Sequence, residues 1–162
     1  MEEGAIVIVG VGGIGCAWSQ RAHSLCQDLA ELLLVDADES SFSSDHEANC
    51  LHLDAAGDAR GAAALPNLAE HRLKEGMGNI QHFLERSELV IILSALGGGT
   101  GSGATSEIAA RARESGSLVL SIVGLPFAEQ PLRCAIADVA LPEIERNSHL
   151  CIRVSLERLA WQ

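Results

Sequence analysis

Five short apolar runs, separated by segments of helical pattern, constrain the fold of this chain most. The runs span residues 5–9, 32–35, 89–93, 118–123 and 150–154. Continuous runs of this length, rich in Val, Ile and Leu, are typical of strands that are buried on both faces of a parallel sheet. The sequence therefore predicts five buried strands.

The segments between these runs have the periodicity of helices. Apolar residues recur at helical spacing across residues 70–87, and residues 108–113 and 132–144 also have a helical pattern. Strands that alternate with helices predict an α/β fold with a doubly wound, mainly parallel, Rossmann-like sheet. In such folds the ligand-binding loops lie at the carboxyl ends of the strands.

The chain length predicts a single domain. A chain of 162 residues can form one core, which removes roughly 68–70% of the unfolded surface from water. We find no internal repeat and no linker, so we expect residues 1–162 to form one domain. Residues 38–68 are rich in Ser, Asp, Ala and Gly, and we expect a functional loop region there.

The formal net charge of -11, with Lys74 as the single lysine, argues against two classes of partner. Nucleic acids and anionic membranes are repelled by such a chain. An anionic ligand would have to be bound by local donors such as backbone N–H groups and helix N-termini.

Cysteines and apolar runs bear on the cellular compartment. The five cysteines are odd in number and have no CxxC spacing, which predicts thiols of a reducing compartment. The first apolar run is too short for a signal peptide, and no run approaches the roughly 18 apolar residues that span a bilayer. We therefore expect a cytoplasmic protein. The six histidines form no ligand-spaced set, so we expect no metal site built from them.

The segment 94–103 is built to bind phosphate. Its five glycines follow an apolar run and precede a helix. Glycine lets successive N–H groups point at one anion, Thr100 and Ser102 add hydroxyl donors, and the helix N-terminus favours negative charge. The alternative, a flexible linker, does not fit between a buried strand and an alanine-rich helix.

A second glycine-rich turn follows the first predicted strand. It contains Gly10, Gly12, Gly13, Ile14, Gly15 and Cys16. This pattern fits dinucleotide-binding folds, adenylating enzymes of the ubiquitin-activating type, or a tight turn without ligand. After the second predicted strand, Asp36 and Asp38 could contact a ribose, orient a metal-bound water, or cap the next turn.

Residues 97–103, GGGTGSG, resemble the signature loop of the FtsZ/tubulin superfamily of polymerising GTPases. The loop is more specific than a lone GxGxxG, and it lacks the closing Lys-Ser/Thr of a Walker loop. The resemblance implies a nucleotide-binding domain of the tubulin/FtsZ type that binds GTP or GDP, with Mg²⁺ as an accompanying ion. It implies that the phosphates contact Gly97, Gly98, Gly99, Thr100, Gly101, Ser102 and Gly103.

Other segments resemble the family in the family's order, from Ile6 to about Leu159. The first glycine-rich turn corresponds to the family's first phosphate loop. Asp38 matches the last residue of an Asn-Thr-Asp segment near the nucleotide, although Asp36 replaces the Asn. Residues 126–133 resemble the Pro-Phe-x-x-Glu-Gly-x-x-Arg loop, shortened by one residue. The resemblance implies that Pro126 is at the site, that Glu129 accepts from ribose hydroxyls, and that Arg133 pairs with Glu129 or the nucleotide. The alternative is an ordinary surface ion pair.

The chain departs from the family pattern at several places. In the family, a second domain supplies the acidic residues that activate water, and we expect residues 1–162 to comprise the nucleotide-binding domain without it, so no catalytic residue is assigned among them. Ala17, and Ser155 or a neighbour of it, stand where the family has base-reading Asn residues, which leaves guanine against adenine preference open. Residues 60–66 correspond to the family loop expected to sense the terminal phosphate. They have alanines where the family has further glycines, and each added Cβ can block the approach of the backbone to that phosphate, which favours a diphosphate over a triphosphate.

Three functions remain open on the sequence. The first is a minimal FtsZ/tubulin-like protein that binds guanine nucleotide, with weak or no autonomous hydrolysis, and associates with filaments of itself or of a full-length homologue. The second is a nucleotide-independent interaction module that regulates such a filament-forming homologue. The third is an adenylating or dinucleotide-binding Rossmann enzyme.

Overall fold

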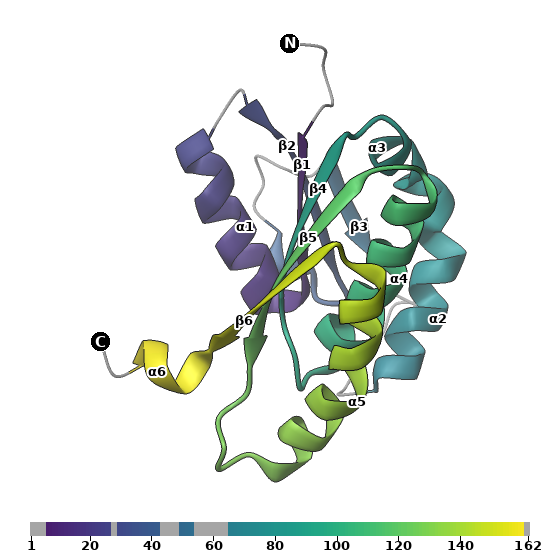
Figure 1. Ribbon diagram of the computed structural model, residues 1–162. Coiled ribbons are helices and arrows are strands. Elements are labelled where there is room, and N and C mark those ends of the chain that lie inside the picture. Colours follow the sequence, from purple (N-terminus) through teal and green to yellow (C-terminus); the bar gives the residue numbers. More distant parts are fainter. Residues whose placement is uncertain (1–5, 27–28, 43–48, 54–64, 161–162) are drawn as a thin grey trace.

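The computed structural model describes residues 6–26, 29–42, 49–53 and 65–160. A six-stranded sheet of order β3-β2-β1-β4-β5-β6 lies at its centre (Figure 1). All five strand pairs are parallel, which confirms the doubly wound α/β fold. The strands are β1 (Ile6–Val11), β2 (Glu31–Asp36), β3 (Cys50–His52), β4 (Leu89–Ala95), β5 (Leu118–Leu125) and β6 (Leu150–Ser155).

Helices cover both faces of the sheet. In Figure 1, α2, α3, α4 and α5 lie on one face, and α1 lies on the other. The strand order reverses between β1 and β4, which is where doubly wound folds bind ligands. The helices are α1 (Gly12–Cys26), α2 (Pro66–Gly76), α3 (Gln81–Glu85), α4 (Gly99–Glu114), α5 (Pro131–Asn147) and α6 (Leu156–Ala160), with 3₁₀ turns η2 (Glu39–Ser41) and η4 (Met77–Asn79).

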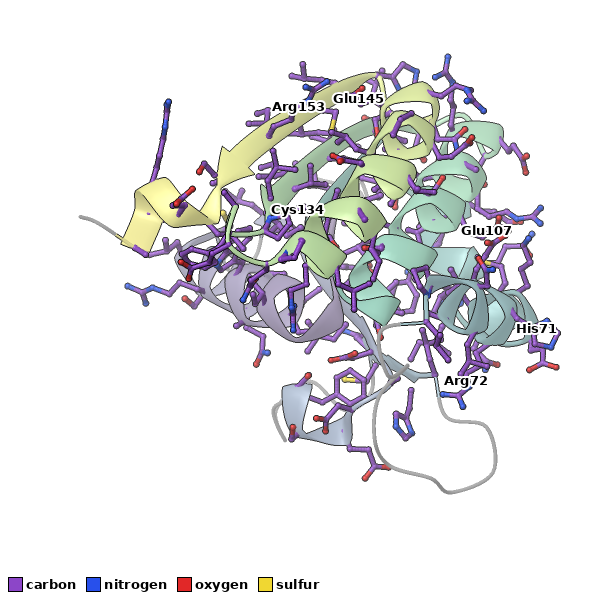
Figure 2. All side chains as sticks on the ribbon, turned by 90° about the horizontal axis from the view of Figure 1, so that it is seen from below. His71, Arg72, Glu107, Cys134, Glu145 and Arg153 are labelled. Carbon is purple, nitrogen blue, oxygen red and sulfur yellow. The ribbon has the colours of Figure 1, made fainter. Side chains whose placement is uncertain are left out.

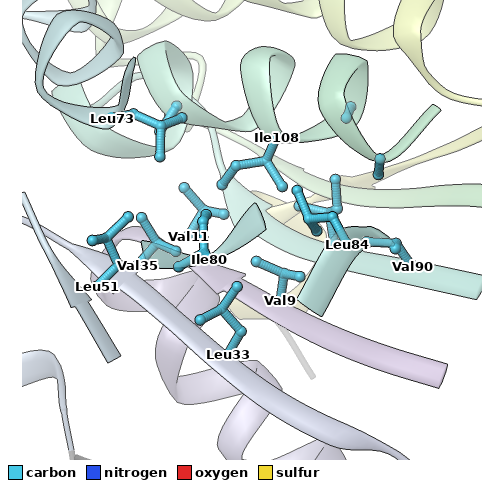
Figure 3. Packing of buried hydrophobic residues seen from close by; sticks show 14 of the residues in the cluster. Val9, Val11, Leu33, Val35, Leu51, Leu73, Ile80, Leu84, Val90 and Ile108 are labelled. Carbon is cyan, nitrogen blue, oxygen red and sulfur yellow. The ribbon is translucent and has the colours of Figure 1, made fainter. Parts of the chain in front are cut away.

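The main core lies between the sheet and helices α2 and α4. Val9 and Leu33 of the sheet face Leu73 of α2 and Ile108 of α4 (Figure 3). Removing these branched side chains from water is the main force that holds the helices on the sheet. The central strands that bear the predicted loops are therefore the most constrained part of the fold.

The α1 side of the sheet is covered unevenly. Ile8, Leu32 and Leu93 are buried against α1, with Trp18 packed beside them. Farther along the sheet, Leu118 of β5 and Leu150 of β6 are 60% and 58% exposed. Because side chains alternate along a strand, both residues face away from α5. The β5–β6 end of this face is thus apolar and open among the described residues.

The prediction of one continuous helix over residues 70–87 is wrong. The segment consists of α2, the 3₁₀ turn η4 and the short helix α3. Gly76 and Gly78 flank the break, and glycine is a weak helix former. A Cβ on Gly76 would also lie 3.0 Å from Leu51 Cδ1. The apolar spacing was nevertheless informative, because Leu73, Met77, Ile80 and Leu84 are all buried.

A sixth strand was missed in the segment that we expected to be irregular. β3 has three residues, pairs with the end of β2, and buries Leu51. A three-residue strand is too short to give a periodic signal. Much of the expected loop region, residues 43–48 and 54–64, lies outside the described residues. So does the alanine-containing segment at 60–64 of the loop expected near the terminal phosphate.

The surface of the protein carries ion pairs and free thiols. Arg153 of β6 lies beside Glu145 of α5 (Figure 2), with Arg153 Nε donating to Glu145 Oε1 at 2.7 Å. Cys16, Cys26, Cys134 and Cys151 are free thiols. Within the described ranges, every helix is too short or too polar to cross a lipid bilayer.

Candidate functional site

The two glycine-rich segments meet at the carboxyl edge of the central strands. β1 and β4 are neighbours, with Val11 opposite Ser94, so the segments that follow them start side by side. α1 begins at Gly12, and α4 begins at Gly99. A Cβ on Gly12 would lie 3.3 Å from the backbone N of Gly101, so the two backbones are in contact. The N-termini of α1 and α4, which cover opposite faces, therefore both open at the carboxyl edge of the sheet.

Positive φ angles and close packing explain why glycine is needed here. Gly12 and Gly97 have φ of +74° and +98°, in the left-handed region that other residues rarely adopt. A Cβ on Gly15 or Gly101 would lie 2.3 Å from Leu93 O or 2.2 Å from Ala95 O. These glycines let the first turns of α1 and α4 press against β4, which brings their N–H groups together.

A cavity of about 490 Å³ lies at these helix N-termini. Its walls come from the carboxyl ends of β1, β2 and β4, the segment after β5, and the starts of α1, α4, α5 and α6. The lining residues are Val11, Gly12, Gly13, Ile14, Asp36, Ala95, Leu96, Gly98, Gly99, Thr100, Gly101, Pro126, Phe127, Gln130, Arg133 and Leu156.

Nine predicted site residues line this cavity. They are Gly12, Gly13, Ile14, Gly98, Gly99, Thr100, Gly101, Pro126 and Arg133. They come from three separate segments of the chain, each following a parallel strand. The sequence motifs thus converge in space on one concave surface.

Other predicted residues lie behind the cavity wall and pack. A Cβ on Gly10 would lie 2.0 Å from Ser19 Oγ, and one on Gly103 would lie 2.0 Å from Pro66 O. Ser102 Oγ accepts a hydrogen bond from Gly97 N at 2.9 Å, which fixes the turn before α4. With Gly15, these residues shape the loops without lining the cavity.

Cys16 is fully buried behind the first glycine turn. Its thiol contacts the carbonyl oxygens of Gly10 and Val35 at 3.6 and 3.8 Å. Burial, with a smaller contribution from the charge of Asp36, raises the pKa of the Cys16 thiol to about 12. This thiol is therefore neutral, and its role is packing.

Two acidic residues that the resemblance implicated lie outside the cavity lining. Asp38 is exposed, and its Oδ1 accepts from Ser40 N at 2.9 Å, so it caps the turn η2. That hydrogen bond also lowers the pKa of Asp38. Glu129 is exposed, and among the described residues no ion pair joins it to Arg133.

Asp36 and Arg133 are the charged residues of the lining, and they follow strands β2 and β5, which are not neighbours in the sheet. Asp36 is 5% exposed at the end of β2. Its Oδ1 accepts from Ala37 N at 2.7 Å, and its Oδ2 accepts from Ser41 Oγ at 2.5 Å. Arg133 is exposed in the first turn of α5, where its Cβ is 2.8 Å from a Cβ built on Gly97.

A larger hollow of about 540 Å³ lies between α2, α4 and α5, but it is unsuited to phosphate. It is lined by the sides of helices, and Glu70, Glu107 and Glu143 are among its lining residues. Carboxylates there repel anions, whereas the smaller cavity lies at two helix N-termini. We therefore assign the candidate site to the 490 Å³ cavity.

Comparison with known proteins decides the family. The model of the tubulin/FtsZ family, GTPase domain, matches residues 5–160. The chain belongs to the tubulin/FtsZ family. The family membership that the glycine-rich loops predicted is therefore confirmed, and so is the predicted tubulin/FtsZ-type fold.

Curated relatives in the family are much longer than this chain. Cell division protein FtsZ 1 of Archaeoglobus fulgidus is 31% identical over 95% of this chain and 42% of its own length. Cell division protein FtsZ of Haloferax mediterranei is 33% identical over 95% of this chain and 41% of its own length. The chain thus spans less than half of these relatives.

Solved structures agree with the family. An empty FtsZ dimer of M. jannaschii superposes with a TM-score of 0.84 at 26% identity, over 97% of this chain and 46% of that chain. CetZ from Methanosaeta thermophila gives a TM-score of 0.75 at 20% identity, over 96% of this chain and 48% of that chain. The second likeness concerns the fold alone.

Several lining residues were not among the predicted site residues. Phe127 and Gln130 lie in the segment 126–133, of which Pro126, Glu129 and Arg133 are predicted site residues, and Leu156 follows the last strand. Asp36 was singled out in the sequence, but the family pattern drew the assignment to Asp38. Position at the carboxyl end of a strand was the signal that could have found them.

Proposed function

We propose that this chain is a nucleotide-binding domain that binds GDP or GTP in the 490 Å³ cavity. It hydrolyses the nucleotide weakly or not at all by itself, and it acts with filaments, either of its own copies or of a full-length homologue. One observation supports this most: the N-termini of two long helices, α1 and α4, converge on one cavity at the switch point of the sheet.

The lining residues suit the parts of a nucleotide. Backbone N–H groups at Gly98–Gly101 and Gly12–Gly13 would donate to phosphate oxygens, and the Thr100 hydroxyl adds a donor. Phe127 and Leu156 offer apolar surface to a purine. The guanidinium of Arg133 supplies positive charge at the same end.

Mg²⁺ would be held mainly by the phosphates. Among the described residues, no group of three or more His, Cys, Asp or Glu could hold a metal ion. Asp36 and the hydroxyl of Thr100 are oxygen donors in the lining, which suits an ion that keeps several waters. Such an ion would neutralise part of the phosphate charge.

Weak hydrolysis is supported by the carboxylates available. Within the described lining, Asp36 is the sole carboxylate, and each of its oxygens already accepts a hydrogen bond. A general base must reach the attacking water, and Asp36 is buried with its orientation fixed by these two hydrogen bonds, so it is not free to swing toward a water. We expect phosphate release from GTP by this chain alone to stay near the uncatalysed background.

Isothermal titration with Gly98→Val tests the site. No atom lies within 4 Å of a Cβ built on Gly98, so valine is accommodated while it fills the cavity floor. We expect the affinity for GDP to fall by about tenfold or more, because phosphate loses its approach to the backbone.

Gly78→Val is the matched control. Gly78 also has open space around its Cβ, but it lies in η4, away from the cavity. It should bind GDP like the parent. Absence of heat with millimolar GDP and GTP in folded wild type, with Mg²⁺ present, would reject the proposal.

A second candidate function is supported by the open apolar face beside α1. Leu118, Leu150 and Ile152 are 60%, 58% and 43% exposed there. An interaction module that docks on a filament-forming homologue would use such a patch. Co-sedimentation with homologue filaments separates the functions: module binding survives Gly98→Val and is lost in Ile152→Asp, whereas nucleotide-dependent binding is lost in Gly98→Val.

The adenylating or dinucleotide enzyme has less support. An adenylating enzyme needs a basic residue near the triphosphate, and Lys74 is instead paired with Glu70 at 2.6 Å on α2. Arg133 remains as the basic residue of the lining. Comparison of GTP with ATP and NAD therefore decides this alternative.

A further inference from the structure

The cavity has two ends of different chemical character. Because the strands run parallel in the order β2-β1-β4-β5-β6, their carboxyl ends follow one another along the rim. Asp36 lies at the β2 end, and Phe127 and Leu156 lie at the β5–β6 end. The two glycine turns, after β1 and β4, lie between these ends.

Size and polarity orient a nucleotide in this cavity, if the proposed function holds. The flat purine ring needs the apolar surface of Phe127 and Leu156, and the ribose joins it to the phosphates. The first phosphates then lie on the glycine turns. A chain of phosphates that continues along the rim extends past Gly13 toward Asp36. The distal phosphate is therefore the group that comes nearest to this carboxylate.

Asp36 cannot turn away from that phosphate. It is 5% exposed, and both of its oxygens are held, by Ala37 N and by Ser41 Oγ. A Cβ built on Gly13 would lie 3.9 Å from Asp36 Oδ2, so the carboxylate borders the first glycine turn. In the described lining, the basic residue is Arg133, which lies in the first turn of α5 after β5 and whose Cβ lies against Gly97 of the second glycine turn. Among the described lining residues, no Lys or Arg side chain therefore forms an ion pair with Asp36.

We propose that Asp36 makes this cavity select nucleotides by phosphate number, favouring the diphosphate over the triphosphate unless a divalent cation neutralises the distal phosphate. This inference rests on the proposed function. Two like charges about 4 Å apart change a binding constant by about fivefold in bulk water and by more in a partly buried site, so a change of about tenfold is a low expectation here. A diphosphate ends on the glycine turns and escapes most of this repulsion.

Titration calorimetry with GDP and a non-hydrolysable GTP analogue tests the inference. In EDTA, wild type should bind GDP about tenfold more tightly than the analogue. Asp36→Asn keeps the shape and the hydrogen bond to Ala37 N but removes the charge. It should tighten binding of the analogue by about tenfold and change GDP binding little.

Glu39→Gln is the matched control. It removes the same charge three residues away, from an exposed side chain outside the cavity lining. It should keep the wild-type preference. Equal affinities of wild type for the two nucleotides in EDTA, or equal changes of both in Asp36→Asn, would overturn the inference.

Wild type alone provides a second readout if Asp36→Asn does not fold. Addition of Mg²⁺ should raise the affinity for the GTP analogue more than the affinity for GDP and so reduce the preference. A preference that Mg²⁺ leaves unchanged would contradict a charge effect. Failure of folded wild type to bind either nucleotide would instead remove the proposed function, which is a distinct result.

Discussion

At the scale of single residues, side chains with similar sequence signals have different environments. Asp36 and Asp38 are two residues apart, yet Asp36 lines the cavity and Asp38 caps an exposed turn. Cys16 follows a glycine turn at a helix N-terminus, where a thiol pKa often falls. Here burial outweighs the helix dipole and raises the pKa of that thiol to about 12.

The buried thiol makes a testable prediction. Its pKa of about 12 exceeds the ordinary 9.0, so the thiolate is absent from the native protein at pH 8.5. We expect a thiol reagent to label exposed Cys26 rapidly and Cys16 only after unfolding. Mass spectrometry of labelled peptides measures this. Cys26→Ser should remove the fast phase, and rapid labelling of native Cys16 would contradict its burial.

The same pKa has a consequence for stability. The folded state holds the Cys16 proton up to about pH 12, whereas the unfolded chain loses it near 9.0. The stabilisation is therefore complete below about pH 9 and is lost as pH rises toward 12. Urea unfolding at pH 8 and pH 10.5 should show a fall in the free energy of unfolding that Cys16→Ala reduces. A fall of equal size in both proteins would assign it to other groups.

At the scale of elements, the type and order of the helices and strands could be predicted better than where a helix is interrupted. The five longer strands were predicted because β-branched and leucine runs are buried on both faces of a parallel sheet. The break in the predicted helix was not, because it depends on Gly76 packing against Leu51, a contact distant in sequence. The three-residue strand β3 has no local pattern and exists through its pairing with β2.

Close contact between α4 and β4 gives a second prediction at this scale. A Cβ on Gly101 would lie 2.2 Å from Ala95 O, a backbone atom that cannot move aside cheaply. We expect Gly101→Ala to lower the free energy of unfolding by about 1–3 kcal/mol, measured by urea denaturation. Gly78→Ala, with open space at its Cβ, should be neutral or stabilising by up to about 1 kcal/mol. Equal stabilities of the two variants would show that the close approach of α4 to β4 does not depend on a glycine at position 101.

At the scale of the whole molecule, the convergence of the site follows from topology. Sequence motifs identified three segments of the cavity, because each follows a predicted strand and parallel strands end at one edge. Which residues of these segments line the cavity depends on which side chains point into it, as that of Asp36 does and that of Glu129 does not. The chain belongs to the tubulin/FtsZ family but spans only 41–42% of two curated relatives, so the activities of those whole proteins do not transfer to it directly.

Nucleotide binding should stabilise the whole fold, because the cavity joins the central strands to α1 and α4. A ligand at 100 times its dissociation constant adds about 2.7 kcal/mol to the free energy of unfolding. For a domain of this size, that corresponds to a rise of roughly 5–10 °C in Tm. We expect GDP to produce this shift in a thermal melt, and ATP and NAD at the same concentration then measure how far the cavity discriminates the base and the rest of the ligand.

The Gly98→Val variant should melt like wild type without ligand and show no shift with GDP, because its cavity floor is filled. A shift of similar size with NAD would favour the dinucleotide enzyme, since its two phosphates would use the same helix N-termini. If GDP still raises the Tm of Gly98→Val, GDP binds somewhere other than the N-termini of α1 and α4.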